Sequence, residues 1–116
     1  MFERGKIILV PFPFTDLSSQ KIRPAVIISC AFAESPDTIV AFISSIPFRK
    51  SRFHVSLPNT HSDFKKTGLK ASSTIRCDKI ATLDKKIVLG EVGILSKSLL
   101  KKMNTALASA LGLSRD

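Results

Sequence analysis

The sequence predicts a mainly β fold, a small β-barrel covered by one C-terminal α-helix. Several short β-branched segments follow one another without a helix between them, and only the last part of the chain has helical periodicity. The chain has 116 residues, close to the commonest size of one domain, and 44% of them are hydrophobic. We therefore expect residues 1–116 to form a single domain with its own core.

The first three strands are predicted from short apolar runs. The first, Lys6–Val10, ends near Pro11, because a proline has no amide proton to give to a central ladder. A polar loop over residues 15–21 follows. The next two segments, Pro24–Ser29 and Thr38–Ser44, are apolar on both faces, which is typical of strands that are covered on both sides.

The later strands alternate between apolar and polar residues. Arg52–Leu57 predicts a half-exposed fourth strand, and residues 59–68 have the composition of a loop. Ser73–Asp78 alternates cleanly, and Ile87–Leu95 predicts a further strand with glycines that suit a sharp bend.

One amphipathic helix is predicted at the end of the chain. Ser96 or Ser98 can cap its start, and Gly112 ends it. Apolar residues recur between these limits at helical spacing: Leu99, Leu100, Met103, Leu107, Ala110 and Leu111. We expect this helix to cover the side of the barrel.

Several classes of protein are disfavoured. No apolar run approaches the ~20 residues of a membrane span, and charges stand where a secretory signal has its hydrophobic region, so we expect a cytoplasmic protein without membrane contact. Cys30 and Cys77 form no CxxC pair, and the chain has only two histidines. We expect two reduced thiols, both small buried hydrophobes, and neither a metal site nor a cofactor.

The charge of the chain is uneven. The formal net charge is +9, and residues 49–116 carry fourteen of the eighteen lysines and arginines against five acidic residues. This excess favours a polyanionic partner, either a nucleic acid or an acidic protein segment. Basic residues that could follow a phosphate backbone, or remain solvated, are Lys21, Arg49, Lys50, Arg52, Lys65, Lys66, Lys70 and Lys79.

The strongest candidate site lies around residue 76. If Ile75 and Cys77 face the core, Arg76 and Asp78 share the opposite face, because successive strand side chains point to opposite sides. The two groups could contact a shared ligand, or form a surface ion pair worth about 0 to 1 kcal/mol.

Other polar residues are candidates at the strand ends. Arg23, held extended by Pro24, suits a phosphate clamp or is a solvated arginine at a strand start. Ser44 and Ser45 could donate to a phosphate or only begin a turn. His54 has no acid or nucleophile near it in the sequence and His61 lies in a loop, so we expect neither to be catalytic.

Two segments in order resemble a known family. Residues 5–17 with Lys21–Ser29, and then residues 73–84, are similar to the two signatures of the MazF/PemK/Kid toxins of bacterial toxin–antitoxin systems. The resemblance covers nearly the whole chain. It implies an SH3-like barrel, a homodimer, and a sequence-selective, metal-independent endoribonuclease that cleaves single-stranded RNA through the 2′-hydroxyl and so inhibits translation and growth.

The resemblance also implies roles for individual residues. The site residues would be Arg23, Ser44, Arg76 and Asp78, with Asp78 as the base and Arg76 as the proton donor. RNA would bind to Lys21, Ser45, Arg49, Lys50 and Lys79. An acidic antitoxin protein would be the partner.

Two alternatives remain open at the level of sequence. The gyrase poison CcdB resembles this family in fold but acts by binding a protein, and Arg23-Pro24 together with Arg76-Cys77-Asp78 argues against it. An inactive RNA-binding barrel would keep the positive charge but tolerate loss of Asp78.

Overall fold

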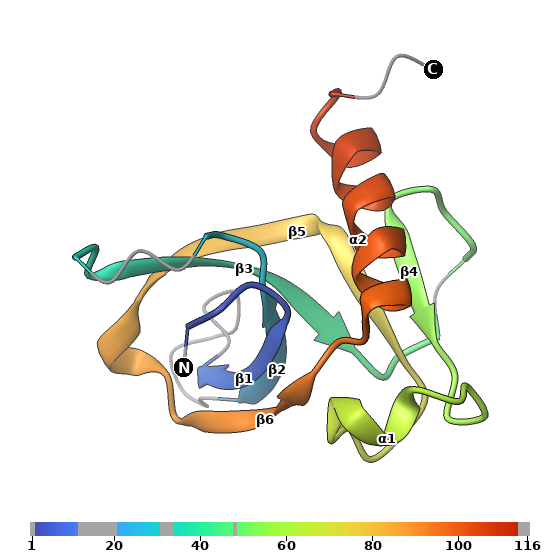
Figure 1. The fold of residues 1–116 in the computed structure, drawn as a ribbon, viewed down its shortest axis with the longest axis horizontal. Helices are drawn as coiled ribbons and strands as arrows, with labels where there is room; N and C mark the ends of the chain where they lie inside the picture. The colour runs from blue at the N-terminus through green and yellow to red at the C-terminus, as the bar shows by residue number, and fades with distance from the viewer. Residues whose placement is uncertain (1, 12–20, 31–33, 48, 114–116) are drawn as a thin grey trace.

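The computed structural model describes residues 2–11, 21–30, 34–47 and 49–113. Its strands form one antiparallel sheet in the order β4-β5-β3-β2-β1-β6, which curls into a barrel-like shape (Figure 1). The strands are β1 (Lys6–Pro11), β2 (Ile22–Ile27), β3 (Asp37–Ser44), β4 (His54–Leu57), β5 (Ser73–Asp84) and β6 (Gly90–Ile94); the helices are α1 (Phe64–Thr67) and α2 (Lys97–Ala110), with a 3₁₀ turn η1 (Lys85–Ile87). The predicted mainly β barrel with a C-terminal helix is confirmed.

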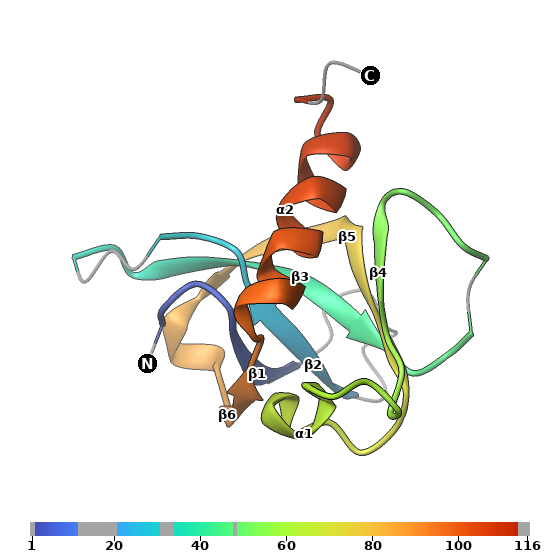
Figure 2. The same cartoon turned by 45° about the vertical axis from the view of Figure 1, so that its right-hand side comes forward.

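Helix α2 covers one face of the sheet. It packs against β4 and β5 (Figure 2), and its buried residues Leu99, Met103 and Leu107 join the side chains of that face in the larger core. The Ser96 hydroxyl caps the helix by accepting the Leu99 amide at 3.4 Å, and Gly112 follows it with a φ of 71°. The sequence predicted both ends of this helix. Within the described residues, neither helix has the length and apolar character needed to cross a bilayer.

The curl of the sheet encloses a second core on the opposite face. The side chains in it come from β1, β2, β3 and β5: Ile8, Val10, Ala25, Ile27, Val40, Phe42 and Leu83. Strands β2 and β3 are apolar on both faces because α2 covers one face and the curled sheet itself covers the other. Burial of both faces of these strands was predicted, and the elements that cover both faces belong to the same chain.

Several predicted elements differ from those observed. Residues 59–68 contain the short helix α1, whose end lies so close to β6 that a Cβ at Gly93 would meet the backbone of Thr67. Strand β5 continues past Asp78 to Asp84, because its second half pairs with the first half of β3. The strand expected over Ile87–Leu95 is shortened to Gly90–Ile94 by the turn η1.

Two burial predictions were wrong. Cys30 is exposed, because it lies three residues beyond the end of β2 at Ile27, whereas Cys77 is buried as expected. Leu111 is 51% exposed because it follows the last turn of α2. Part of the polar loop expected over 15–21, residues 15–20, lies outside the described residues.

Strand β5 carries a bulge in the middle. Its residue Ile80 pairs with Ala41 of β3, whereas Arg76 pairs with the next residue of β3, Phe42. Residues 77–79 therefore have no partner on β3. On the other side of β5, the Cys77 amide donates to the carbonyl of Phe53 at 3.0 Å, next to the start of β4. Bulges of this kind re-aim side chains and are common beside functional sites.

Candidate functional site

Arg76 and Asp78 lie on the face of β5 that points away from α2. Ile75 and Cys77 are 0% and 1% exposed in the larger core, which turns their neighbours to the other side as the alternation predicted. The Arg76 guanidinium holds the carboxylate with two parallel bonds, Nε to Oδ1 at 2.9 Å and Nη2 to Oδ2 at 3.0 Å. This bidentate geometry fixes the plane of the guanidinium.

The pair shifts the titration of both groups. The hydrogen bond from Arg76 holds the pKa of the Asp78 carboxyl below its usual range, and the same bond raises the pKa of Arg76. A carboxylate with a lowered pKa is a weaker proton acceptor, and an arginine with a raised pKa is a weaker proton donor. Electrostatic stabilisation and positioning are therefore the contributions that this pair is best suited to make.

A hollow of about 170 Å³ adjoins Arg76. Its polar lining comes from Arg23 on β2, Ser44 on β3, and Arg76 and Lys79 on β5; Phe42, Ile43 and Ile46 complete it. Arg23 reaches it because it lies two residues before Ala25, which pairs with Phe42, and Phe42 pairs with Arg76. Three cationic side chains and a hydroxyl thus surround one space, an arrangement that suits a phosphate group. Asp78 lies behind Arg76 and is not part of this lining.

The two serines at the end of β3 differ. The Ser44 hydroxyl accepts the Ile46 amide at 3.1 Å, which is the turn role expected of such a residue, and its proton stays available to a ligand. Ser45 is exposed and lines a neighbouring hollow of about 330 Å³, which also contains Arg23 and Lys70. Arg23 therefore stands between two adjoining hollows.

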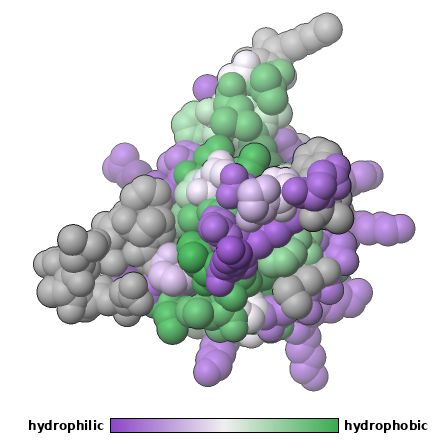
Figure 3. Space-filling model, turned by 90° about the vertical axis from the view of Figure 1, so that its left-hand side faces the viewer, coloured by the Kyte–Doolittle hydropathy of each residue, from purple (hydrophilic) through white to green (hydrophobic). Residues whose placement is uncertain are grey.

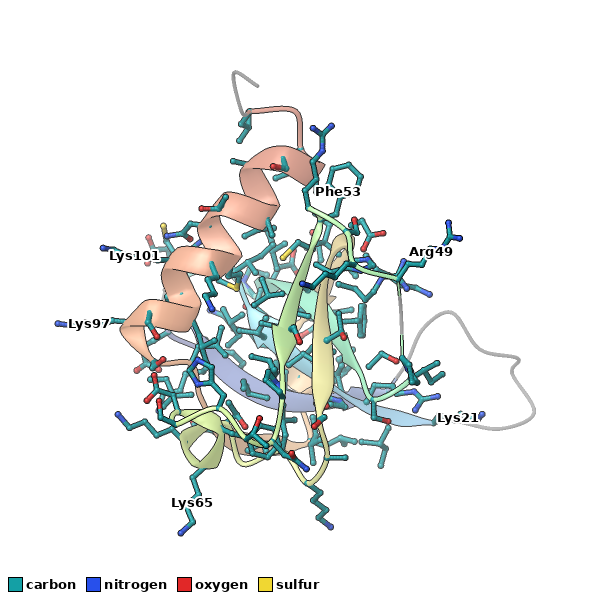
Figure 4. The ribbon with its side chains drawn as sticks, turned by 90° about the vertical axis from the view of Figure 1, so that its right-hand side faces the viewer. Lys21, Arg49, Phe53, Lys65, Lys97 and Lys101 are labelled. Carbon is teal, nitrogen blue, oxygen red and sulfur yellow. The ribbon has the colours of Figure 1, made fainter. Side chains whose placement is uncertain are left out.

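Some of the other predicted basic residues flank this region, whereas Lys65 and Lys66 lie on α1. Arg49 and Lys50 line a third hollow of about 470 Å³ together with Arg52, Ser56 and Thr74. Figure 4 shows Lys21 and Arg49 on one side of the β4–β5 ribbon, with Lys97 and Lys101 of α2 on the other. The basic residues are therefore spread over the flank of the hollows, the outer side of α2, and α1, which carries Lys65.

His54 lies beside the Arg76–Asp78 pair, a position that was not predicted from the sequence. Strand β4 pairs with β5 so that His54 stands opposite Arg76, and its Nε2 lies 3.2 Å from Oδ1 of Asp78. His54 has no acid near it in the sequence, but the fold brings Asp78 beside it. Both strands had been identified by their alternation, but only their pairing brings the imidazole to the carboxylate.

His61 is placed as a structural residue. Its Nδ1 accepts the Asp63 amide at 3.0 Å in the turn before α1. Across the described ranges, no group of three or more histidines, cysteines or acidic residues is arranged to hold a metal ion.

A family of known proteins matches most of the chain. The pattern of the family described as "PemK-like, MazF-like toxin of type II toxin-antitoxin system" matches residues 3–111. No curated protein sequence matches the chain.

Solved structures with the same fold include three toxins. A mycobacterial endoribonuclease bound to its cognate antitoxin has 22% identity and a TM-score of 0.78, with 98% of each chain covered. The Mycobacterium tuberculosis toxin MazF-mt6 has 20% identity and a TM-score of 0.76, covering 94% of this chain and 98% of its own. A MazE–MazF complex from Deinococcus radiodurans has 20% identity and a TM-score of 0.74, covering 97% and 96%. The match over residues 3–111 shows that the chain belongs to the PemK-like, MazF-like toxins of type II toxin–antitoxin systems.

Proposed function

We propose that this toxin is a metal-independent, sequence-selective endoribonuclease that cleaves single-stranded RNA and thereby inhibits translation and growth. The observation that carries the proposal is the hollow lined by Arg23, Arg76 and Lys79. A pentacovalent phosphorane carries more negative charge than the phosphodiester from which it forms. Cations fixed around that charge lower the barrier, because they do not have to reorganise during the reaction. The similar fold of proteins described as endoribonucleases supports the same assignment.

The proposed reaction breaks one bond and forms one. The 2′-oxygen gives its proton to water and attacks the adjacent phosphorus, the bond from phosphorus to the 5′-oxygen breaks, and that oxygen takes a proton from water. The products are a 2′,3′-cyclic phosphate and a 5′-hydroxyl. Arg23, Arg76 and Lys79 would hold the phosphoryl oxygens, and the Ser44 hydroxyl would donate to one of them. Asp78 with its lowered pKa is a poor base, so we expect a slow enzyme.

Long mixed-sequence RNA tests this proposal. The purified protein is incubated with the RNA in excess chelator, the cuts are mapped, and the end groups are identified. We expect cleavage after a preferred sequence, cyclic phosphate ends, and no gain on adding magnesium. Arg23→Ala should lower the cleavage rate about a hundredfold, while Lys97→Ala on the far side of α2 should not change it (Figure 4). Activity that requires magnesium would contradict the mechanism. RNA binding without cleavage would indicate the inactive RNA-binding barrel, and binding to gyrase without cleavage the CcdB-like poison.

We also propose that an acidic antitoxin segment silences the protein by occupying these hollows. Related folds are found with a cognate antitoxin or with MazE, and the cationic side chains that suit phosphates suit carboxylates equally. Binding should weaken steeply with salt. An antitoxin that left RNA cleavage intact at saturation would show that it binds elsewhere.

We propose a homodimer as well, on the strength of exposed apolar residues. Leu111 and Leu113 are 51% and 75% exposed beyond the end of α2, and Figure 3 shows hydrophobic side chains at that end of the molecule. Side chains of this size are favoured in contacts between subunits. Light scattering should give twice the mass of the chain at micromolar concentration, and the mass of one chain would contradict the proposal.

A further inference from the structure

His54 is the polar group closest to the Arg76–Asp78 pair on the neighbouring strand. Its imidazole is only 13% exposed, and its Nε2 lies 3.2 Å from Oδ1 of Asp78, the oxygen that also accepts Arg76 Nε. Register fixes this contact, because His54 and Arg76 are paired across β4 and β5. A residue in this position is held by the backbone of the sheet rather than by a loop.

The bulge makes Asp78 dependent on β4. Residues 77–79 have no pairing partner on β3, so that strand does not position the Asp78 backbone. The hydrogen bond from the Cys77 amide to the Phe53 carbonyl joins the bulge to the residue just before His54. Phe53, just before β4, therefore supplies a backbone contact to this segment, and His54 of β4 adds a side-chain contact to that of Arg76.

The three side chains form a chain of contacts that ends at the hollow. Arg76 lines the hollow, Asp78 holds Arg76 with two bonds, and His54 contacts Asp78 from the far side. The contact of His54 Nε2 with Asp78 Oδ1 is close enough for electrostatic attraction, although it is not aligned as a hydrogen bond. Both nitrogens of His54 are screened from solvent, so the imidazole is suited to act through Asp78.

We propose that His54 is a positioning residue of this active site: it fixes the Asp78 carboxylate, which in turn aims the Arg76 guanidinium at the phosphate hollow. The inference rests on the proposed endoribonuclease function and deepens it. In this arrangement neither His54 nor Asp78 has to exchange a proton with the RNA. A misaimed guanidinium weakens only interactions that form in the transition state, so the effect of losing His54 falls on kcat.

Two variants separate positioning from packing. His54→Gln keeps an N–H donor at about the reach of Nε2, and His54→Leu keeps the volume without a donor. We expect the Leu variant to lower kcat at least about tenfold with KM within about twofold, and the Gln variant to recover most of the loss. His61→Gln, which changes the other histidine of the chain, is the matched control and should leave both constants unchanged. Urea unfolding midpoints show whether the variants are folded.

A second measurement does not depend on RNA cleavage. In the wild type, the Arg76 Nε proton should exchange slowly in NMR spectra because Asp78 holds it; in His54→Leu it should exchange faster, and in His54→Gln it should stay slow. If the wild type cuts no RNA, the proposed function fails, while this exchange rate still decides the inference. Equal kcat in the Leu variant and the wild type, a Gln variant as slow as the Leu variant at equal stability, or an unchanged exchange rate would each overturn it.

Discussion

Replacing Arg76 with alanine should separate catalysis from folding and from RNA binding. The substitution removes the guanidinium that lines the hollow and both of its bonds to Asp78. The side chains of the pair are 23% and 32% exposed, so solvent screens their attraction. A pair of this kind contributes at most about 1 kcal/mol to the free energy of unfolding. Ile75 and Cys77, which anchor the strand in the core, are unchanged.

The expected loss in rate is much larger. One fixed donor at a developing anionic charge is worth on the order of 3 kcal/mol in the transition state, or about a hundredfold in rate. The expected loss in affinity is small, because Arg23 and Lys79 remain on the hollow. Loss of one phosphate contact should reduce the slope of the logarithm of the binding constant against the logarithm of the salt concentration by about 1.

Three measurements on one variant test this reasoning. Single-turnover cleavage of a labelled RNA gives the rate, anisotropy with the same RNA carrying a 2′-deoxy residue at the cut gives the affinity, and urea unfolding gives the stability. Lys97→Ala, which removes one positive charge from α2, is the control for net charge. The reasoning is refuted if the rate of Arg76→Ala falls only as much as its affinity, or if the variant is destabilised enough to account for the loss.

Three further predictions concern the thiols and the core. In the native protein a disulfide reagent should modify Cys30 quickly and Cys77 only after unfolding, so that absorbance reports one thiol before urea and two after it. Burial raises the pKa of the Cys77 thiol to about 12, against about 8.5 in an unfolded chain. The unfolded state therefore ionises first as the pH rises, so the stability of the fold is full below pH 8.5 and falls between pH 8.5 and 12. Unfolding curves should show that the free energy of unfolding falls by about 2 kcal/mol between pH 8.5 and 10, and Cys77→Ala should lack this pH dependence. Leu99 lies on α2 and is fully buried, so Leu99→Ala should lower the unfolding free energy by about 2 to 5 kcal/mol. A loss of less than about 1 kcal/mol would show that α2 is not part of the cooperative core.

The site was predictable from the sequence wherever a single strand decides it. Alternation alone put Arg76 and Asp78 on one face, and their bidentate contact confirms it. The approach of Arg23 to Arg76 depends on two registers, β2 with β3 and β3 with β5, and here the family resemblance supplied what pattern could not. The contact of His54 depends on the pairing of β4 with β5, and neither pattern nor resemblance indicated it.

The fold was predictable from the sequence where local patterns decide it, and not where contacts between distant segments decide it. Period-two and period-3.6 patterns identified the strands and α2, because burial of one face or both leaves a mark on the sequence. Helix α1 has only four residues, and the Asp63 side chain makes no cap at its start. Its packing against β6 at Gly93 is a tertiary contact that composition does not reveal.

The bulge in β5 reverses the parity of the strand. Before it, the odd-numbered Ile75 and Cys77 face the larger core; after it, the even-numbered Ile80 packs there, and the odd-numbered Leu83 faces the second core. The face of β5 that carries Arg76 before the bulge thus carries core residues such as Leu83 after it. One side of the strand contributes to the site in its first half and to the second core in its second half. An odd number of unpaired residues, three, makes this inversion. If one of them were deleted, simple alternation along β5 would still bring Ile80 to the larger core and Leu83 to the second core. The facing of the second half of β5 therefore depends on how many residues separate Arg76 from Ile80, whereas substitutions at the exposed Asp78 leave the parity intact.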